Sequence, residues 1–84
     1  MDAEIDYDSG IPPYRQLAAI LRTQIGAGKI TGRFPTDKTL MQEYGLAIGT
    51  VRKAVALLRE EGLIETARGW GSRVLPPEER PGQR

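Results

Sequence analysis

The sequence predicts an α+β domain, three helices followed by a two-stranded β-hairpin, from two observations on residues 45–74. Over residues 47–61 the apolar positions recur with helical spacing, and Gly62 closes the helix. Two short strand-like runs follow, joined by a glycine-bracketed tip at residues 69–71. This order of elements is that of a winged helix-turn-helix, in which the third helix lies in a DNA groove and the hairpin, or wing, grips the flanking backbone.

The length and composition leave room for one small domain. Eighty-four residues supply a single core. The absence of cysteine and histidine removes disulfides, thiolate metal ligands and the commonest general base, so we expect neither an enzyme nor a bound metal or other cofactor. No apolar run approaches the roughly 20 residues that span a bilayer, and the acidic N-terminus is unlike a signal peptide. A cytoplasmic location is therefore expected.

Charge is distributed unevenly along the chain. The net charge is +1, yet residues 1–9 carry −4, and residues 10–75 hold ten lysines and arginines against five acidic residues. A basic middle suits a polyanionic partner. An ordinary solvated surface explains the same charge pattern equally well.

The first helix is expected to follow an acidic arm. Residues 1–11 lack apolar periodicity, which predicts a flexible segment. Pro12 and Pro13 fit the start of a helix, because proline at the first helical position loses no hydrogen bond. The apolar residues that follow at helical spacing are Leu17, Ala18, Leu21 and Ile25. Gly26 and Gly28 end the helix.

A short second helix is expected after an extended crossing at residues 32–35. Thr36 is a good N-cap, and Asp37 places negative charge at the positive end of the helix. The apolar stripe consists of Leu40, Met41 and Tyr44. Gly45 is suited to the left-handed conformation that turns the chain toward the third helix.

The third helix, about residues 47–61, is the candidate recognition helix. One buried arc contains Val51, Ala54, Val55 and Leu58, and the opposite side contains Gly49, Arg52, Lys53 and Ala56. Small residues let a backbone approach a groove closely, while basic residues reach phosphates or guanine edges. An ordinary solvated helix face can have the same composition, so the helix alone does not decide between the two interpretations. The neighbouring hairpin favours the DNA-binding one.

The wing is expected to consist of strands at residues 63–66 and 72–75 around a tip at residues 68–71. Trp70 is interpreted as a surface residue, such as a groove wedge, rather than a lid on the core, because the flanking glycines supply little to pack against. The winged domain thus covers residues 12–75. Residues 76–84, rich in proline and charge, are expected to form a disordered tail.

The residues from about Pro12 to Val74 resemble the DNA-binding domain of the GntR family of bacterial transcription regulators. Several motifs carry the resemblance in family order. They are Pro13-Tyr14 with Gln16-Leu17-Ala18 and Leu21-Arg22, then Gly28-Lys29-Ile30, Pro35-Thr36-Asp37 with Leu40, Thr50-Val51-Arg52-Lys53-Ala54-Val55 with Leu58, Glu61-Gly62-Leu63-Ile64, and Gly69-Trp70-Gly71-Ser72 with Val74.

The chain also departs from the family pattern. Leu46, Ala47 and Ile48 stand where the family usually has Val-Ser-Arg, which removes a helix N-cap worth about 1 kcal/mol and an arginine that contacts DNA in the family. Trp70 replaces a usual basic wing residue, and the link over residues 28–35 is about two residues shorter. These changes predict the family fold with a different operator sequence.

Family members normally carry a C-terminal domain that binds an effector and dimerises. This chain ends about ten residues after the wing, so the sequence fits either a stand-alone DNA-binding protein or an excised domain. With little apolar surface beyond one core, we expect a monomer or weak homodimer that pairs on a palindromic operator.

The leading interpretation is therefore a sequence-specific, double-stranded DNA-binding transcriptional regulator, most simply a repressor. Arg52 and Lys53 are expected in the major groove, Thr36 and Thr50 on phosphates, and the wing on the neighbouring minor groove or backbone. The full set of expected DNA-contacting residues is Thr36, Lys38, Gly49, Thr50, Arg52, Lys53, Arg68, Gly69, Trp70, Gly71 and Arg73.

A second interpretation keeps the fold and changes the partner. A winged-helix module that binds another protein through the third helix or the wing would not read DNA sequence. Its main support is Ile48, which adds an apolar spot where the family has arginine.

Overall fold

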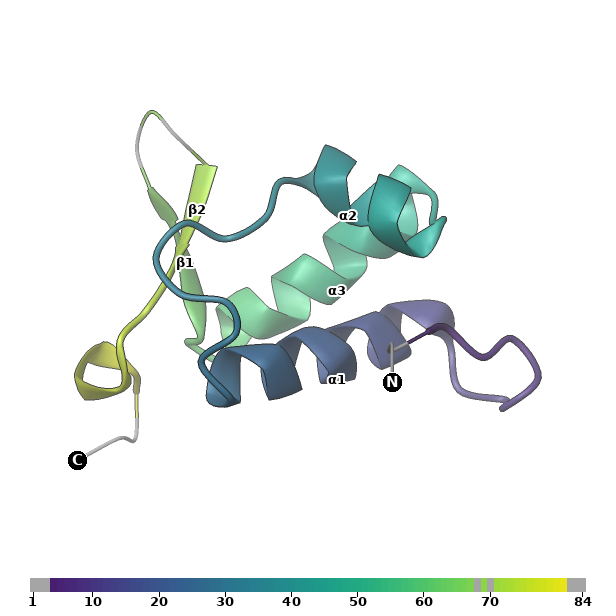
Figure 1. Cartoon of the computed structure of the whole chain (residues 1–84), viewed down its shortest axis with the longest axis horizontal. Coiled ribbons are helices and arrows are strands. Elements are labelled where there is room, and N and C mark those ends of the chain that lie inside the picture. Colours follow the sequence, from purple (N-terminus) through teal and green to yellow (C-terminus); the bar gives the residue numbers. More distant parts are fainter. Residues whose placement is uncertain (1–3, 68, 70, 82–84) are drawn as a thin grey trace.

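Three helices and a β-hairpin form the structure, a computed structural model that describes residues 4–81 apart from residues 68 and 70 (Figure 1). Helices α1 and α3 run side by side, α2 packs against α3, and the hairpin lies at one end of this pair. The elements are α1 (Pro13–Gly26), α2 (Asp37–Tyr44), α3 (Ile48–Glu60), β1 (Ile64–Ala67), β2 (Gly71–Val74) and a short 3-10 helix η1 (Pro77–Glu79). The winged helix-turn-helix expected from the sequence is confirmed. Within the described residues, none of the helices has the length and hydropathy to cross a bilayer.

The ends of α1 and α2 follow the expected signals. Helix α1 starts directly after Pro12, and its last turn is followed by Gly28 at φ +76°. In α2 the Thr36 hydroxyl accepts a hydrogen bond from the Thr39 amide at 3.1 Å, which satisfies one of the free amides of the first turn. Gly45 takes the left-handed conformation at φ +65° and directs the chain into α3.

The start and the end of α3 differ in how they are capped. Ala47 occupies the N-cap and makes no side-chain hydrogen bond, as expected for a chain without the family serine. At the other end Gly62 lies at φ +77°, and the Leu63 amide donates to the Leu58 carbonyl at 3.1 Å. Because this bond ties Leu63 to the helix end, β1 begins one residue later than the sequence predicted.

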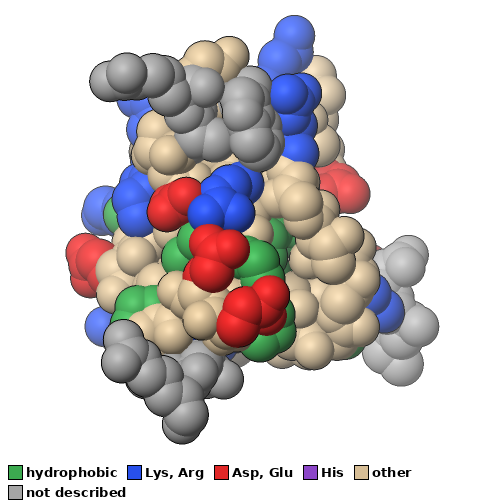
Figure 2. All heavy atoms as spheres, turned by 90° about the vertical axis from the view of Figure 1, so that its left-hand side faces the viewer, with side chains coloured by type: hydrophobic (Ala, Val, Ile, Leu, Met, Phe, Trp, Pro, Cys, Tyr) green, Lys and Arg blue, Asp and Glu red, His purple; other side chains and the backbone are tan. Residues whose placement is uncertain are grey.

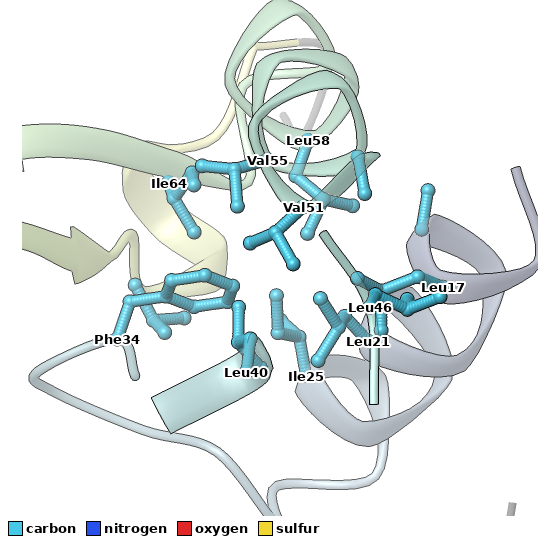
Figure 3. Close-up of a cluster of buried hydrophobic side chains, with 13 residues drawn as sticks. Leu17, Leu21, Ile25, Phe34, Leu40, Leu46, Val51, Val55, Leu58 and Ile64 are labelled. Carbon is cyan, nitrogen blue, oxygen red and sulfur yellow. The ribbon is translucent and has the colours of Figure 1, made fainter. Parts of the chain in front are cut away.

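The core lies where the three helices meet the hairpin (Figure 3). All the apolar positions assigned to the buried arcs of the first and third helices are buried. Phe34, Leu46, Val74 and Leu75 complete it from the connecting segments and the wing. The side chains with the largest fully buried volumes are Leu17, Leu21, Leu40, Leu58, Ile64 and Val51.

The base of the wing is joined to the segment before α2. Strands β1 and β2 pair antiparallel with Ile64 opposite Val74 and Ala67 opposite Gly71. The Val74 amide donates to the Gly32 carbonyl at 2.7 Å, and the Phe34 amide donates to the Ser72 carbonyl at 2.9 Å. The extended crossing expected at residues 32–35 therefore runs beside β2, where Arg33 forms an isolated antiparallel bridge with Arg73, and it carries the buried Phe34 ring into the core.

A surface ion pair joins α1 to the end of α3. The Arg22 guanidinium donates to both carboxylate oxygens of Glu61, at 2.7 and 2.6 Å. These bonds hold the pKa of the Glu61 carboxyl below its ordinary value. Since a depressed carboxyl pKa stabilises the fold above the unfolded pKa, this small contribution is lost as the pH falls through the acid range.

The N-terminal segment contacts α1 through one side chain. The Gln16 amide nitrogen donates to the carbonyls of Asp6 and Ile11, at 2.8 and 2.7 Å, while its amide oxygen accepts from the Asp6 backbone at 2.7 Å. Ile5 is half-buried against the core. We expected a flexible arm over residues 1–11; the described part of it follows a turn that these bonds hold against α1.

The segment after β2 also contacts the domain. Helix η1 follows Pro76, and the Arg80 guanidinium donates to the Leu75 carbonyl at 2.8 Å. A Cβ on Gly62 would overlap the Pro81 ring, so Pro81 lies directly against Gly62. Disorder was expected from residue 76 onward, whereas the structure places residues 76–81 on the domain.

Candidate nucleic-acid interface

One side of α3 is buried and the other is open to solvent. Val51, Ala54, Val55 and Leu58 form the buried side. The residues exposed on the other side at its first two turns are Ile48, Gly49, Arg52 and Lys53. Thus the fold leaves the expected recognition surface uncovered, and its charged members are both basic.

Arg52 lies at the junction of α3 and α2. Its side chain is 71% exposed, and its guanidinium stands 3.6 Å from the Asp37 carboxylate in the first turn of α2. An exposed pair at this distance is a weak interaction that a stronger ligand displaces. The Arg52 guanidinium therefore lies beside the first turn of α2 and remains available to a ligand.

Lys53 contacts the beginning of α1. Its ammonium lies 5.5 Å from the centre of the Tyr14 ring, and the Arg15 guanidinium lies 5.8 Å from the same ring. The Tyr14 hydroxyl accepts a hydrogen bond from Arg15 at 3.2 Å. Tyr14 thus gathers two cations from different helices into one positive region.

Gly49 is a helical glycine that packing inside the chain does not require. A Cβ placed on it would meet no atom within 4 Å, and its φ is not positive. Glycine in an exposed helix lowers stability by about 1 kcal/mol relative to alanine. Packing within the described residues therefore does not require glycine at position 49.

The other polar residues expected to contact DNA lie at the first turns of α2 and α3. Thr36 caps α2 and its hydroxyl also donates to the Thr39 hydroxyl at 2.9 Å. Lys38 is exposed in the first turn of α2, and Thr50 is half-buried in the first turn of α3.

A hollow of about 210 Å³ joins α2, α3 and the wing. Its lining residues are Phe34, Pro35, Thr36, Asp37, Val55, Arg59, Gly71 and Ser72. The fold therefore brings Thr36 and Gly71, which were expected to contact DNA, to one surface. It adds Arg59, an exposed cation one turn beyond Val55 that the sequence reasoning did not single out.

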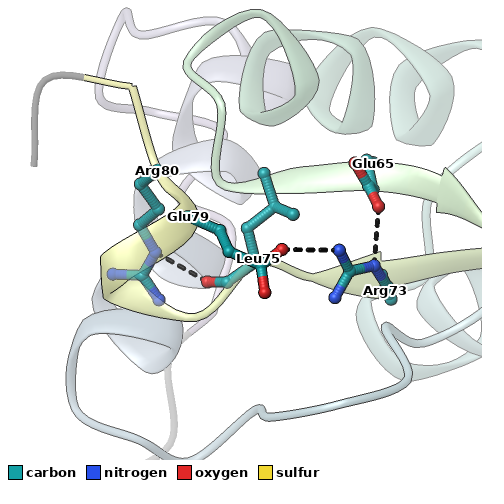
Figure 4. A network of polar contacts seen from close by, with 5 residues as sticks. All are labelled: Glu65, Arg73, Leu75, Glu79 and Arg80. Atoms are coloured by element: carbon teal, nitrogen blue, oxygen red, sulfur yellow. Dashed lines mark hydrogen bonds and ion pairs between the residues drawn. The ribbon is translucent and has the colours of Figure 1, made fainter.

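In the wing, Arg73 is committed to two carboxylates. It donates to Glu65 on the neighbouring strand at 2.6 Å and to Glu79 in η1 at 2.7 Å (Figure 4). The hydrogen bond to Glu79, and then that to Glu65, raises the pKa of the Arg73 guanidinium. The surface on the wing side correspondingly shows acidic side chains beside basic ones (Figure 2).

The wing tip is described only in part. Gly69 and Gly71 have φ values of +87° and +92°, the left-handed region that favours glycine in a tight hairpin. The expectations for Arg68 and Trp70 lie outside the described residues.

Three contributors escaped the sequence reasoning: Arg59, Tyr14 and Glu79. Tyr14 and Lys53 are far apart in the sequence and no local pattern connects them. Glu79 was assigned to a disordered tail, so its pairing with Arg73 was missed. Across residues 4–81, leaving aside 68 and 70, no group of three or more acidic residues is placed to hold a metal ion.

Comparisons with known proteins agree with this arrangement. The family described as "Bacterial regulatory proteins, gntR family" matches residues 13–74. The chain is 38% identical over 65 residues to the mannosyl-D-glycerate transport/metabolism system repressor MngR of Escherichia coli, covering 75% of this chain and 27% of MngR. It is 32% identical over 66 residues to the regulator SmoD of Agrobacterium fabrum, covering 76% of this chain and 28% of SmoD. The chain spans less than a third of the length of these curated relatives.

Solved structures match over most of the chain. YtrA from Sulfolobus acidocaldarius, a GntR-family transcription factor, superposes with a TM-score of 0.79 at 28% identity, covering 88% of this chain and 80% of YtrA. AraR(DBD), solved in complex with an operator, has a TM-score of 0.73 at 30% identity and covers 89% of this chain and 93% of that one. The family comprises regulatory proteins, in line with the expectation that the chain is not an enzyme. With a match over residues 13–74 and this fold, the chain belongs to the GntR family of bacterial regulatory proteins.

Proposed function

We propose that this chain binds double-stranded DNA in a sequence-specific manner and acts as a transcriptional regulator, most simply a repressor, in the cytoplasm. The observation that carries the proposal is the solvent-exposed side of α3, where Arg52 and Lys53 stand beside small residues. A structural neighbour was solved with its operator, and a relative is named a repressor, which supports the same role here.

In this proposal α3 enters the major groove. Arg52 reads a guanine edge, because a guanidinium can donate two parallel hydrogen bonds to it. Lys53 and Lys38 neutralise phosphates, and Thr36 and Thr50 contact phosphates near helix N-termini. Gly49 lets the α3 backbone approach the groove wall.

The wing contacts the flanking minor groove or backbone. The proposed contact consists of the four consecutive residues Arg68, Gly69, Trp70 and Gly71. Arg73 contributes less than we expected from the sequence, since a phosphate has to compete with Glu65 and Glu79 for its guanidinium.

Two copies are proposed to pair on a palindromic operator. The apolar side chains of the described residues are largely used in one core, so the free protein is a monomer or a weak dimer. Adjacent half-sites about one helical turn apart bring the second copy to a raised effective concentration.

Duplex enrichment followed by titration tests the proposal. A random duplex pool is enriched with the protein, and the winning sequence is titrated at several salt concentrations. We expect the logarithm of affinity to fall linearly with the logarithm of salt concentration. The affinity for the enriched sequence should exceed that for a scrambled duplex. Equal, negligible affinity for both duplexes contradicts the proposal and favours the protein-interaction module.

Lys53→Gln should lower the salt slope by about one unit, because a lysine on a phosphate releases about one counterion. Lys29→Gln is the matched control: it makes the same charge change beyond the other end of α1 from the Tyr14–Lys53 contact. The measurement is affinity as a function of salt for the three proteins. Equal slopes for both variants contradict the assignment of Lys53.

Gly49→Ala should move stability and DNA affinity in opposite directions. The added methyl group has free space in the isolated protein and removes backbone freedom from the unfolded chain, so unfolding should cost about 0.5–1 kcal/mol more. On DNA the same methyl stands between α3 and the groove wall, and affinity should fall. Thermal melting and duplex titration measure the two effects.

Gly26→Ala provides the comparison for Gly49→Ala. Gly26 is also helical, also has free space for a Cβ, and lies at the end of α1 away from the proposed surface. It should raise stability and leave DNA affinity unchanged. An unchanged affinity in Gly49→Ala as well would mean that α3 does not approach DNA closely there.

A further inference from the structure

Ile48 is an apolar side chain exposed on a basic surface. Among the described residues the large apolar side chains that stand exposed are Tyr7, Ile11 and Ile48. The first two belong to the N-terminal segment, whereas Ile48 is the first residue of α3 and is 36% exposed. Its position in the proposed recognition helix sets it apart.

The surroundings make Ile48 prominent. Ala47 before it is exposed and small, and at Gly49 after it there is open space where a Cβ would stand. Arg52 follows one helical turn later, so its side chain and that of Ile48 lie on the same face of α3. Ile48 is thus a partly exposed apolar side chain on the same helix face as the exposed Arg52 guanidinium, with small residues on either side of it in the sequence.

The chemistry of this surface selects the partner. Arg52 on the same face and Lys53 on the same two turns of α3 are both exposed and basic, which suits a polyanion carrying an apolar group. In the DNA major groove that group is the C5-methyl of thymine, the one methyl that a base edge presents there. The N-terminal residues of a recognition helix are those that reach base edges.

We propose that Ile48 reads the C5-methyl group of a thymine close to the base pair contacted by Arg52. This inference rests on the proposed function and adds a base preference to it. Burying one methyl group of DNA against Ile48 is expected to strengthen binding about 4-fold.

The test removes that methyl group from the DNA alone. In the enriched operator each thymine is replaced in turn by deoxyuridine, which pairs identically and lacks the C5-methyl group. The full 84-residue chain should lose about 4-fold in affinity at one thymine position of each half-site and little elsewhere.

Two variants locate the effect on the protein. Ile48→Ala should bind the thymine and deoxyuridine operators equally at that position, because its short side chain no longer reaches the methyl group. Lys53→Gln should bind both more weakly and keep the 4-fold difference between them. Matching melting temperatures of Ile48→Ala and the unaltered protein establish that the fold is intact.

The outcomes separate this inference from the function on which it rests. Sequence-specific binding with no sensitive thymine, or with the same sensitivity in Ile48→Ala, overturns the role of Ile48 and leaves the DNA-binding function standing. Failure to bind any duplex overturns both.

Discussion

Leu58→Ala is expected to produce the largest loss of stability among single substitutions on α3. The Leu58 side chain is fully buried at the centre of the core, and truncating such a leucine costs about 2–5 kcal/mol because a cavity remains. Small domains have free energies of unfolding near the low end of about 5–15 kcal/mol. The melting temperature should therefore fall by more than about 10 °C, as measured by circular dichroism.

Leu57→Ala is the matched control for the core prediction. It is the same substitution on the adjacent residue of α3, whose side chain is only half-buried against the core. Leu57→Ala should lower the free energy of unfolding much less, because neighbouring side chains and solvent fill the space that the leucine leaves. Equal losses in the two variants would contradict the placement of Leu58 at the centre of the core.

Arg52→Ala is expected to produce the largest loss of DNA affinity among single substitutions on α3. Loss of a bidentate guanine contact costs about 1–3 kcal/mol, or about 5- to 150-fold. It should also remove the preference for one base pair of the operator, because no other group on α3 replaces the guanidinium. Titrations of the enriched operator and of its variants at each position measure both effects.

Arg52→Lys distinguishes base reading from charge. Lysine keeps the positive charge near Asp37 but lacks the planar pair of donors. The salt dependence should stay close to that of the unaltered protein, while the base preference should weaken. Retention of full specificity by Arg52→Lys would mean that Arg52 serves only as a positive charge.

Local sequence signals were sufficient for the helices. The apolar periodicity from Leu17 to Ile25 and from Val51 to Leu58 predicted the buried faces, because a helix face depends on spacing alone. Thr36 and Gly45 predicted the ends of α2 for the same reason: a cap is a local hydrogen-bonding problem. These features need no knowledge of the rest of the fold.

Contacts between distant segments were not predictable in this way. Arg73 was predicted to contact DNA because it is a basic residue in the wing. Its contacts with Glu65 and Glu79 could not be predicted, because they depend on strand pairing and on the position of η1. Tyr14 beside Lys53 likewise depends on how α1 crosses α3. Proline and charge in the tail are typical of disorder, but the bond from Arg80 to the Leu75 carbonyl holds that segment in place.

The two hydrogen bonds that join β2 to residues 32 and 34 have a consequence for the DNA. They link the base of the wing to the chain that enters α2, and α2 packs against α3. We therefore expect the wing and α3 to keep a nearly constant separation. In the proposed complex the duplex must then adjust by bending or changing its minor-groove width, so flanking sequences that deform easily should be favoured even where no side chain touches their bases.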